Sequence, residues 1–158
     1  MRSAPGVFIA IYTDEKAKCF SVFRRNSFGS IPGILETEVG YAGGKKQDVT
    51  YEEVCKGDSG HAEVVKIIFD EKIISFEKIL DLFFKMHDPT QVDMQYPDIG
   101  TQYRSEIFYK NDDQKVIAFR TKEKINKIYN GKIATNISKL QNYCKAEEYH
   151  QKYIEKNK

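Results

Sequence analysis

The sequence predicts a two-layer α/β (α+β) sandwich, in which a mixed β-sheet carries helices packed on it and long ordered loops join the elements. Three observations support this prediction. The chain has 158 residues, which suits a single domain over residues 1–158. With 41% hydrophobic and 30% charged residues it is able to bury a core. Short apolar runs alternate with two long amphipathic segments, and no repeat or low-complexity linker interrupts them.

Five short apolar runs predict the strands. Residues 34–42 alternate roughly between apolar and polar after Pro32-Gly33 and stop at Gly43-Gly44, which is typical of a half-buried strand between turns. Residues 62–69 form another apolar run that ends at two acidic residues. The remaining predicted strands are residues 7–12, 105–109 and 133–137.

Two segments have helical periodicity. Ser75 is a favourable N-cap for a helix with apolar residues every three or four positions. These predicted core residues are Phe76, Ile79, Leu80, Phe83 and Phe84. Asn111-Asp112 opens a second amphipathic helix, which Asn130-Gly131 closes. Its predicted inward residues are Val116, Phe119, Ile125 and Ile128. Residues 146–156 predict a charged terminal helix.

Charge and hydropathy exclude several classes of function. A net charge of +2 lacks the excess of cations that nucleic-acid binding needs. The longest apolar run near the N-terminus, residues 7–12, is too short for a signal sequence, and nothing approaches the ~20 residues of a membrane span. We therefore expect a cytoplasmic protein, taken to be a monomer, that binds neither nucleic acid nor membrane.

Two long polar segments predict the position of a site. Residues 87–104 have no periodicity but contain Tyr, Met and His, a composition that argues against disorder. Residues 43–61 hold Tyr51, Cys55 and His61 among several glycines. Long ordered loops in a compact domain are usually functional, so we expect one site built from both segments.

Cys19 and Glu63 are the candidates for covalent and acid–base chemistry. Cys19 has lysines before it and two arginines after it, and nearby cations favour the nucleophilic thiolate. The alternative for Cys19 is a buried core thiol. Glu63 begins an otherwise apolar strand, where burial would raise its pKa and make it a proton donor. The alternative for Glu63 is a solvated strand edge.

Tyrosine, cysteine and histidine residues suggest further roles. Tyr51 and Tyr103 are candidates to donate phenolic hydrogen bonds to an oxyanion or a sulfoxide oxygen, or they simply half-bury their rings. Cys19, Cys55 and Cys144 are too few for a disulfide scaffold and form no C-x-x-C pair. The three histidines fit no metal motif and are interpreted as structural, so no metal is expected.

Several motifs resemble those of one family, the A-class peptide methionine sulfoxide reductases. They occur in the family's order across residues 32–153. The motifs are Gly40-Tyr41-Ala42-Gly43-Gly44, Thr50-Tyr51-Glu52-Glu53-Val54-Cys55, Gly57-Asp58-Ser59-Gly60-His61-Ala62-Glu63-Val64, His87-Asp88-Pro89-Thr90-Gln91, Asp98-Ile99-Gly100-Thr101-Gln102-Tyr103-Arg104-Ser105 and Ala146-Glu147-Glu148-Tyr149-His150-Gln151. The resemblance implies a ferredoxin-like core with long ordered loops.

The resemblance also implies roles in the reduction of methionine S-sulfoxide, in proteins and as the free amino acid. Cys19 corresponds to the nucleophile and Phe20 to a wall of the pocket for the substrate methyl group. Glu63 corresponds to the group that protonates the sulfoxide oxygen, Tyr51 and Tyr103 to the phenols that bind it, and Asp98 to a further polar residue. Such a reaction needs no metal or organic cofactor, and the oxidised cysteine is reduced through a second thiol by thioredoxin or another dithiol.

Residues 13–30 depart from the family pattern. Ser21 stands where the family has Trp, and the chain contains no Trp at all. The family's cysteine-rich C-terminal extension is also missing, which leaves Cys144 as the candidate resolving thiol or as an ordinary packed thiol. Cys55 is expected to be a buried structural thiol. These departures leave an alternative function, a catalytically impaired relative that binds oxidised methionine or a partner protein.

Overall fold

The computed structural model describes residues 6–10, 31–96 and 98–147. The elements in these ranges are β1 (Gly6–Ala10), β2 (Ile34–Ala42), α2 (Tyr51–Cys55), β3 (Ala62–Phe69), α3 (Phe76–Met86), β4 (Met94–Gln95), β5 (Asp98–Ile99), the 3-10 turn η2 (Thr101–Tyr103), β6 (Glu106–Tyr109), α4 (Asp112–Ile128), β7 (Asn136–Lys139) and β8 (Cys144–Lys145).

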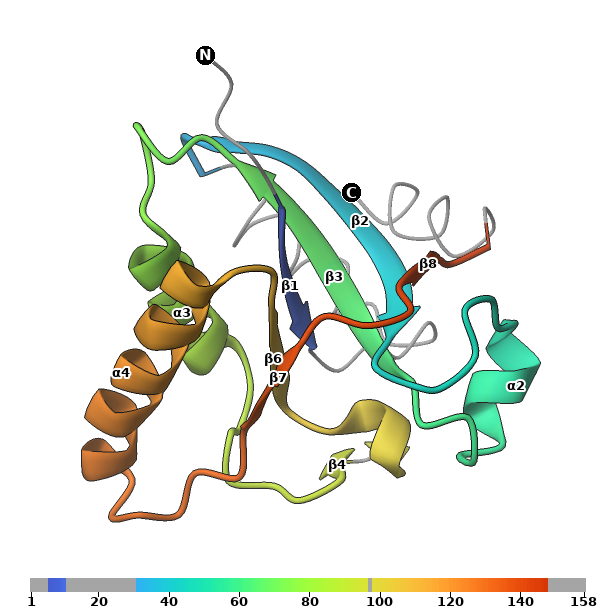
Figure 1. The fold of residues 1–158 in the computed structure, drawn as a ribbon. Helices are drawn as coiled ribbons and strands as arrows, with labels where there is room; N and C mark the ends of the chain where they lie inside the picture. The colour runs from blue at the N-terminus through green and yellow to red at the C-terminus, as the bar shows by residue number, and fades with distance from the viewer. Residues whose placement is uncertain (1–5, 11–30, 97, 148–158) are drawn as a thin grey trace.

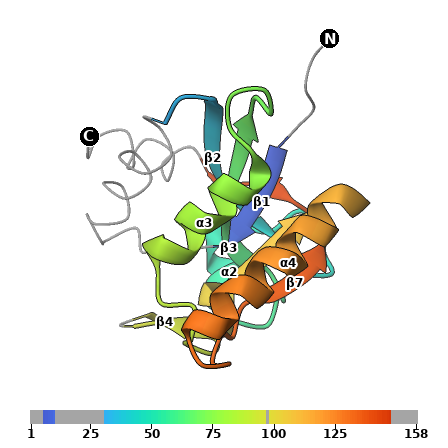
Figure 2. The same ribbon diagram turned by 90° about the vertical axis from the view of Figure 1, so that its left-hand side faces the viewer.

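The described strands form a six-stranded sheet with the order β7-β6-β1-β3-β2-β8, together with a separate β4-β5 pair. The sheet is mixed, because β6 and β7 run parallel whereas its other described pairs are antiparallel. Helices α3 and α4 lie side by side on one face of the sheet (Figures 1 and 2). The predicted two-layer α/β sandwich is therefore confirmed.

The centre of the sheet explains the apolar run of β3. This strand lies between β1 and β2, and its alternating side chains contribute to two separate buried clusters, Val65 to one and Val64 to the other. Val64 and Val65 point to opposite faces and both are fully buried. Strand β2 follows the predicted range, and β3 begins with Ala62-Glu63 at the end of the sheet that faces α2 (Figure 1).

Helix α3 begins where the sequence predicts. The Ser75 side chain accepts a hydrogen bond from the Lys78 amide at 3.1 Å, which satisfies one of the amides left unpaired at the first turn. All five predicted core residues, Phe76, Ile79, Leu80, Phe83 and Phe84, are buried. The periodic apolar face is thus confirmed.

Helix α4 has the predicted start but not the predicted buried face. Asn111 caps it by accepting from the Gln114 amide at 2.9 Å. Val116, Phe119 and Ile128 are nevertheless exposed, so the prediction that they face inward was wrong. The buried positions are Gln114, Ala118 and Thr121, with Ile117 and Ile125 partly buried. Small side chains suit a close approach to the neighbouring elements, and the Gln114 amide oxygen accepts from the Lys110 amide at 2.7 Å.

Three further observations concern the predicted strand over residues 133–137, the two predicted loops and the predicted terminal helix. Strand β7 starts at Asn136 rather than at residue 133, because the preceding Ala134 amide donates to the Pro89 carbonyl at 2.7 Å instead of to a strand. The two predicted loops contain the short elements α2, β4, β5 and η2. Most of the predicted terminal helix, residues 148–156, lies outside the described residues, and residues 146–147 are not helical.

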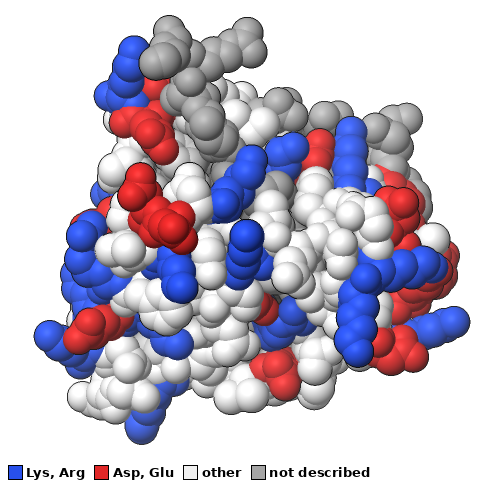
Figure 3. All heavy atoms as spheres, in the orientation of Figure 1, with Lys and Arg blue, Asp and Glu red and all other residues white. Residues whose placement is uncertain are grey.

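Positive and negative side chains are interspersed on the face shown in Figure 3, consistent with the small net charge. None of the helices in the described ranges combines the length and the apolar character that crossing a bilayer requires.

Candidate active site

Glu63 occupies the second position of β3 and is only 4% exposed. It pairs with Tyr41 on β2, and Tyr41 pairs on its other side with Cys144 on β8. Directly paired residues project from the same face of a sheet, and neighbouring strands are about 5 Å apart. Glu63, Tyr41 and Cys144 therefore form one row across three strands, and Glu63 is a buried carboxyl rather than a solvated strand edge.

Tyr51 is brought to this row by the start of α2. Its backbone amide donates to Glu147 Oε2 at 2.9 Å, and the Tyr41 hydroxyl donates to Glu147 Oε1 at 3.1 Å. One carboxylate from the end of the described chain thus ties the helix to the sheet. Thr50 caps the helix by accepting from the Glu53 amide at 3.2 Å. Val54 and Tyr51 pack into the same hydrophobic cluster as Tyr41.

Tyr103 reaches the same region from η2. This turn packs against β3, and Thr101 Oγ1 donates to the Gly57 carbonyl at 3.4 Å. Arg104, directly after Tyr103, donates through Nη2 to the Gly60 carbonyl at 3.1 Å. Gly60 adopts a φ of +80°, a left-handed conformation that favours glycine, just before the chain enters β3. The segment leading to Glu63 and the segment holding Tyr103 are therefore in direct contact.

Asp98 lies in β5, where its backbone pairs with Gln95 of β4. Gln95 is buried and exchanges two hydrogen bonds with the backbone of Asp88, at 2.8 and 3.3 Å. Strand β4 also packs against η2. The described part of the predicted loop over residues 87–104 thus contains β4, β5 and η2. In Figure 1, β4 lies at the same end of the molecule as α2 and the start of β3.

The two described cysteines differ in environment. Cys144 is partly buried, and its thiol lies 3.8 Å from the Val49 carbonyl oxygen. Burial raises the pKa of the Cys144 thiol, and the carboxylates of Asp48, Glu147 and Glu53 raise it further. Cys144 is therefore a protonated thiol near neutral pH. Cys55 is exposed at the end of α2, so the expectation of a buried structural thiol was wrong. It occupies a surface face of a one-and-a-half-turn helix.

Both described histidines have structural partners. His61 is buried with Nε2 at 3.1 Å from the Asn142 carbonyl, and its ring leaves no room for a side chain at Gly44. His87 bridges the Phe83 carbonyl and the Ser105 hydroxyl. Within the described ranges, no group of three or more His, Cys, Asp or Glu side chains is arranged to hold a metal ion.

The predicted nucleophile Cys19 and the predicted pocket residues Phe20 and Ser21 lie outside the described residues. The structure adds three contributors that sequence reasoning did not single out, namely Tyr41, Arg104 and Glu147. Each lies inside a quoted motif, but motif membership alone does not indicate which residue contacts which. Their roles depend on pairing between segments far apart in the sequence.

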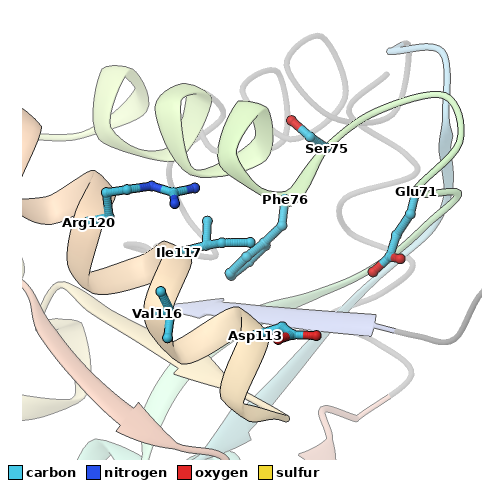
Figure 4. Close-up of a pocket in the computed structure, with 7 residues that line it drawn as sticks. All are labelled: Glu71, Ser75, Phe76, Asp113, Val116, Ile117 and Arg120. Carbon is cyan, nitrogen blue, oxygen red and sulfur yellow. The ribbon is translucent and has the colours of Figure 1, made fainter.

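A separate hollow lies between α3 and α4 (Figure 4). Its volume is about 490 Å³, and Phe76 and Ile117 point toward each other across it (Figure 4). Glu71 and Asp113 lie near one end and Arg120 near the other. No cysteine, histidine or tyrosine is found among the described residues that line it. A smaller hollow of about 260 Å³ lies beside α2 and is lined mainly by charged side chains. Of the predicted catalytic residues whose side chains the structure describes, Tyr51, Glu63 and Tyr103 line neither hollow.

Comparison with known families identifies the chain. The family model described as Peptide methionine sulfoxide reductase matches residues 17–158, a range that includes Cys19 and Ser21. The chain belongs to this family. Pelagibacter ubique Peptide methionine sulfoxide reductase MsrA is 57% identical over 129 residues, which span 82% of this chain and 88% of that protein.

Solved structures of the family share the fold. The reduced form of Mxr1 from Saccharomyces cerevisiae aligns with a TM-score of 0.83 at 35% identity, covering 97% of this chain and 85% of the yeast chain. A structure of Mxr1 in complex with Trx2 aligns with a TM-score of 0.62 at 26% identity, covering 93% and 84% of the two chains. The chain is thus an oxidoreductase of the methionine sulfoxide reductase family, and this function is favoured over that of a non-catalytic binding protein.

Proposed function

We propose that the chain reduces methionine S-sulfoxide to methionine, in proteins and as the free amino acid, with Cys19 as the nucleophile. Family membership supports the reaction class, and the buried Glu63 carboxyl supports the mechanism most directly. A carboxyl that is 4% exposed, in a strand flanked by the segments that carry Tyr51 and Tyr103, is well suited to hold a proton for the substrate oxygen.

The chemistry proceeds in two stages. The sulfoxide oxygen is a poor leaving group, so Glu63 donates a proton to it while Tyr51 and Tyr103 hold it by hydrogen bonds. The Cys19 thiolate attacks the substrate sulfur, and the protonated oxygen is then transferred to the cysteine sulfur. The substrate S–O bond and the transient S–S bond break, so methionine leaves and Cys19 becomes a sulfenic acid. The substrate sulfur gains two electrons and the cysteine sulfur loses two. A second thiol then condenses with the sulfenic acid, which releases water and leaves a disulfide for a dithiol to reduce.

Several finer assignments belong to this proposal. Phe20 and Ser21 flank the substrate methyl group, and Asp98 supplies a further polar group. Cys144 supplies the second thiol, supported by its place in the same row as Glu63. The complex of yeast Mxr1 with Trx2 supports a thioredoxin as the reducing partner. The single domain over residues 1–158, the monomeric state and the cytoplasmic location remain predictions.

Turnover of a methionine sulfoxide peptide with dithiothreitol tests the proposal. The parent should be active, and Cys19→Ser should abolish turnover. Glu63→Gln should lower kcat by about 10²-fold or more, since general acid catalysis contributes about 10²–10⁴-fold. Glu123→Gln, an exposed glutamate of α4, serves as the matched control and should leave kcat unchanged. Retained turnover in Cys19→Ser would refute the nucleophile, and an inactive parent would favour the impaired relative.

A further inference from the structure

Arg104 makes side-chain hydrogen bonds to three separate segments. Nε donates to Glu106 Oε1 at 2.5 Å, Nη1 donates to the Thr101 carbonyl at 2.9 Å, and Nη2 donates to the Gly60 carbonyl at 3.1 Å. The side chain is only 15% exposed. One guanidinium therefore connects β6, the turn η2 and the loop before β3.

These three contacts lie close in the sequence to two of the proposed catalytic residues. Tyr103 is the residue between Gln102 and Arg104, and its own amide is bonded to the Gly100 carbonyl at 3.0 Å. Glu63 follows Gly60 by three residues. The other described side-chain link between these two segments, from Thr101 to Gly57, is 3.4 Å long and hence weaker. Of these two side-chain hydrogen bonds between the Tyr103 segment and the loop before Glu63, the one from Arg104 is the shorter.

We propose that Arg104 is a positioning residue, which fixes the Tyr103 phenol relative to the Glu63 carboxyl so that both reach the same sulfoxide oxygen. This inference rests on the proposed function. Glu106, whose side chain is 5% exposed, accepts from Nε and sets the orientation of the guanidinium from the rigid strand β6. The two remaining nitrogens then face the two carbonyl oxygens that have to be held together.

Only arginine suits this arrangement. The guanidinium is planar and presents five donors in a fixed fork, whereas the lysine ammonium is a compact point charge on a flexible stem. Lysine at position 104 would keep a positive charge next to Glu106 but would not hold both carbonyls in one geometry. A misplacement of about 1 Å in a catalytic group costs up to about 10²-fold in rate. Losing the fixed geometry of the guanidinium donors should therefore lower the reaction rate, in addition to any effect on stability.

A double-mutant cycle on kcat tests the proposal, with Arg104→Lys and Tyr103→Phe made singly and together. In the parent we expect Tyr103→Phe to lower kcat about tenfold or more, as loss of a donor to the reacting oxygen does. In the Arg104→Lys background the same change should lower kcat by less than about twofold, because the phenol is already misplaced. Arg120→Lys, which alters a surface pair with Glu77, is the control and should leave the tenfold effect intact.

Additive effects of the two substitutions would overturn the positioning role while leaving the proposed function in place. An unchanged kcat in Tyr103→Phe alone would overturn the positioning role together with the assignment of Tyr103, while the retained turnover would still support the proposed reaction. If Arg104→Lys does not fold, the pair Arg104→Gln with Glu106→Gln removes the fork without leaving a buried charge, and it should show the same loss of coupling.

A measurement independent of activity separates this inference from the proposed function. Amide hydrogen exchange in Arg104→Lys should accelerate in residues 57–61 and 100–104, while the α3 amides keep the protection seen in the parent. Unchanged exchange in both segments would overturn the inference even in a fully active enzyme. If the parent is inactive but exchange is still faster in Arg104→Lys than in the parent, the proposed function is refuted and the structural link through Arg104 is supported.

Discussion

At the scale of single residues, burial decides between the two interpretations that the sequence allowed for Glu63. A glutamate at the start of an apolar run is compatible with an exposed edge or with a buried acid. The choice depends on β3 lying between β1 and β2, which local sequence does not specify. The same holds for Cys55, whose motif suggested burial but whose position on a short helix leaves it exposed.

Cys144→Ser tests which thiol resolves the sulfenic acid. In a single turnover without reductant, the parent should lose two thiols per methionine formed, and Cys144→Ser should lose one. Because the pKa of the Cys144 thiol is raised, its thiolate fraction is small at pH 7 and grows with pH. Loss of the second thiol should therefore be faster at pH 9 than at pH 7, as measured by thiol titration in quenched samples.

Cys55→Ser is the matched control for that experiment. It should still lose two thiols per turnover and should retain thioredoxin-supported activity. If Cys55→Ser instead loses one thiol and Cys144→Ser loses two, the exposed cysteine of α2 is the resolving thiol and the assignment of Cys144 is wrong.

At the scale of elements, α2 is too short to be stable by itself, and its position depends on Glu147. We expect Glu147→Gln to weaken the bonds to the Tyr51 amide and the Tyr41 hydroxyl, because a neutral amide is a poorer acceptor than a carboxylate. The free energy of unfolding should fall by about 1 kcal/mol. Since Tyr51 begins the helix, kcat/KM should fall as well. Urea denaturation and steady-state kinetics measure the two effects.

Glu52→Gln provides the comparison for Glu147→Gln. Glu52 is an exposed glutamate of the same helix, and its substitution should change stability by no more than about 0.5 kcal/mol. Equal effects of the two substitutions would show that Glu147 does not anchor α2.

Helix α4 gives a second prediction at this scale, because its exposed apolar residues should contribute little to stability. Ile128 is 71% exposed and Ile79 of α3 is fully buried. Ile79→Ala should lower the free energy of unfolding by about 2–5 kcal/mol, since it removes buried contacts and leaves a cavity. Ile128→Ala should change it by no more than about 0.5 kcal/mol. A large loss in Ile128→Ala, measured by urea denaturation, would show that this residue is covered in solution.

The contrast between α3 and α4 shows what periodicity predicts. The α3 face is uniformly large and apolar, so a 3.6-residue pattern identifies it without ambiguity. In α4 the apolar residues are scattered, and the buried stripe is made of Gln114, Ala118 and Thr121. A stripe of small and polar residues is recognisable only once the facing surface is known. Caps were predicted well for both helices because they depend on local chain geometry.

At the scale of the whole molecule, the fold class followed from the alternation of strands and helices, but the strand order and the site did not. The order β7-β6-β1-β3-β2-β8 places β1 and β8, the first and last described strands, in one sheet. Tyr41, Glu63 and Cys144 align only because β2 pairs with β3 and with β8. Such pairings are non-local, so the sequence motifs named candidate residues but not which of them are paired in the sheet.

A chain of hydrogen bonds connects the helical layer to the sheet through His87. Nδ1 lies 2.8 Å from the Phe83 carbonyl, which only accepts, so Nδ1 carries the proton. Nε2 therefore accepts from the Ser105 hydroxyl at 2.7 Å, and Ser105 in turn accepts from the Thr135 hydroxyl at 2.7 Å. Ser105 and Thr135 are almost fully buried. The network holds the end of α3 to the segments that begin β6 and β7, and it requires a neutral ring.

This network predicts loss of stability in mild acid. Burial lowers the pKa of His87 from 6.5 to about 4, against smaller opposing effects of the Phe83 hydrogen bond and Asp88. Between these values the unfolded chain binds a proton that the folded chain does not, so stability falls as pH drops from 6.5 toward 4, by about 3 kcal/mol at most. His87→Gln keeps a donor and an acceptor but does not titrate. Urea denaturation at pH 7.5, 5.5 and 4.5 should show a smaller decline in this variant. Asp88 does not account for this decline. Hydrogen bonds from Thr90 lower the pKa of Asp88 below 3.8, so its contribution to the free energy of unfolding is lost only at a still lower pH. Parallel declines in parent and variant would show that His87 is not the group responsible.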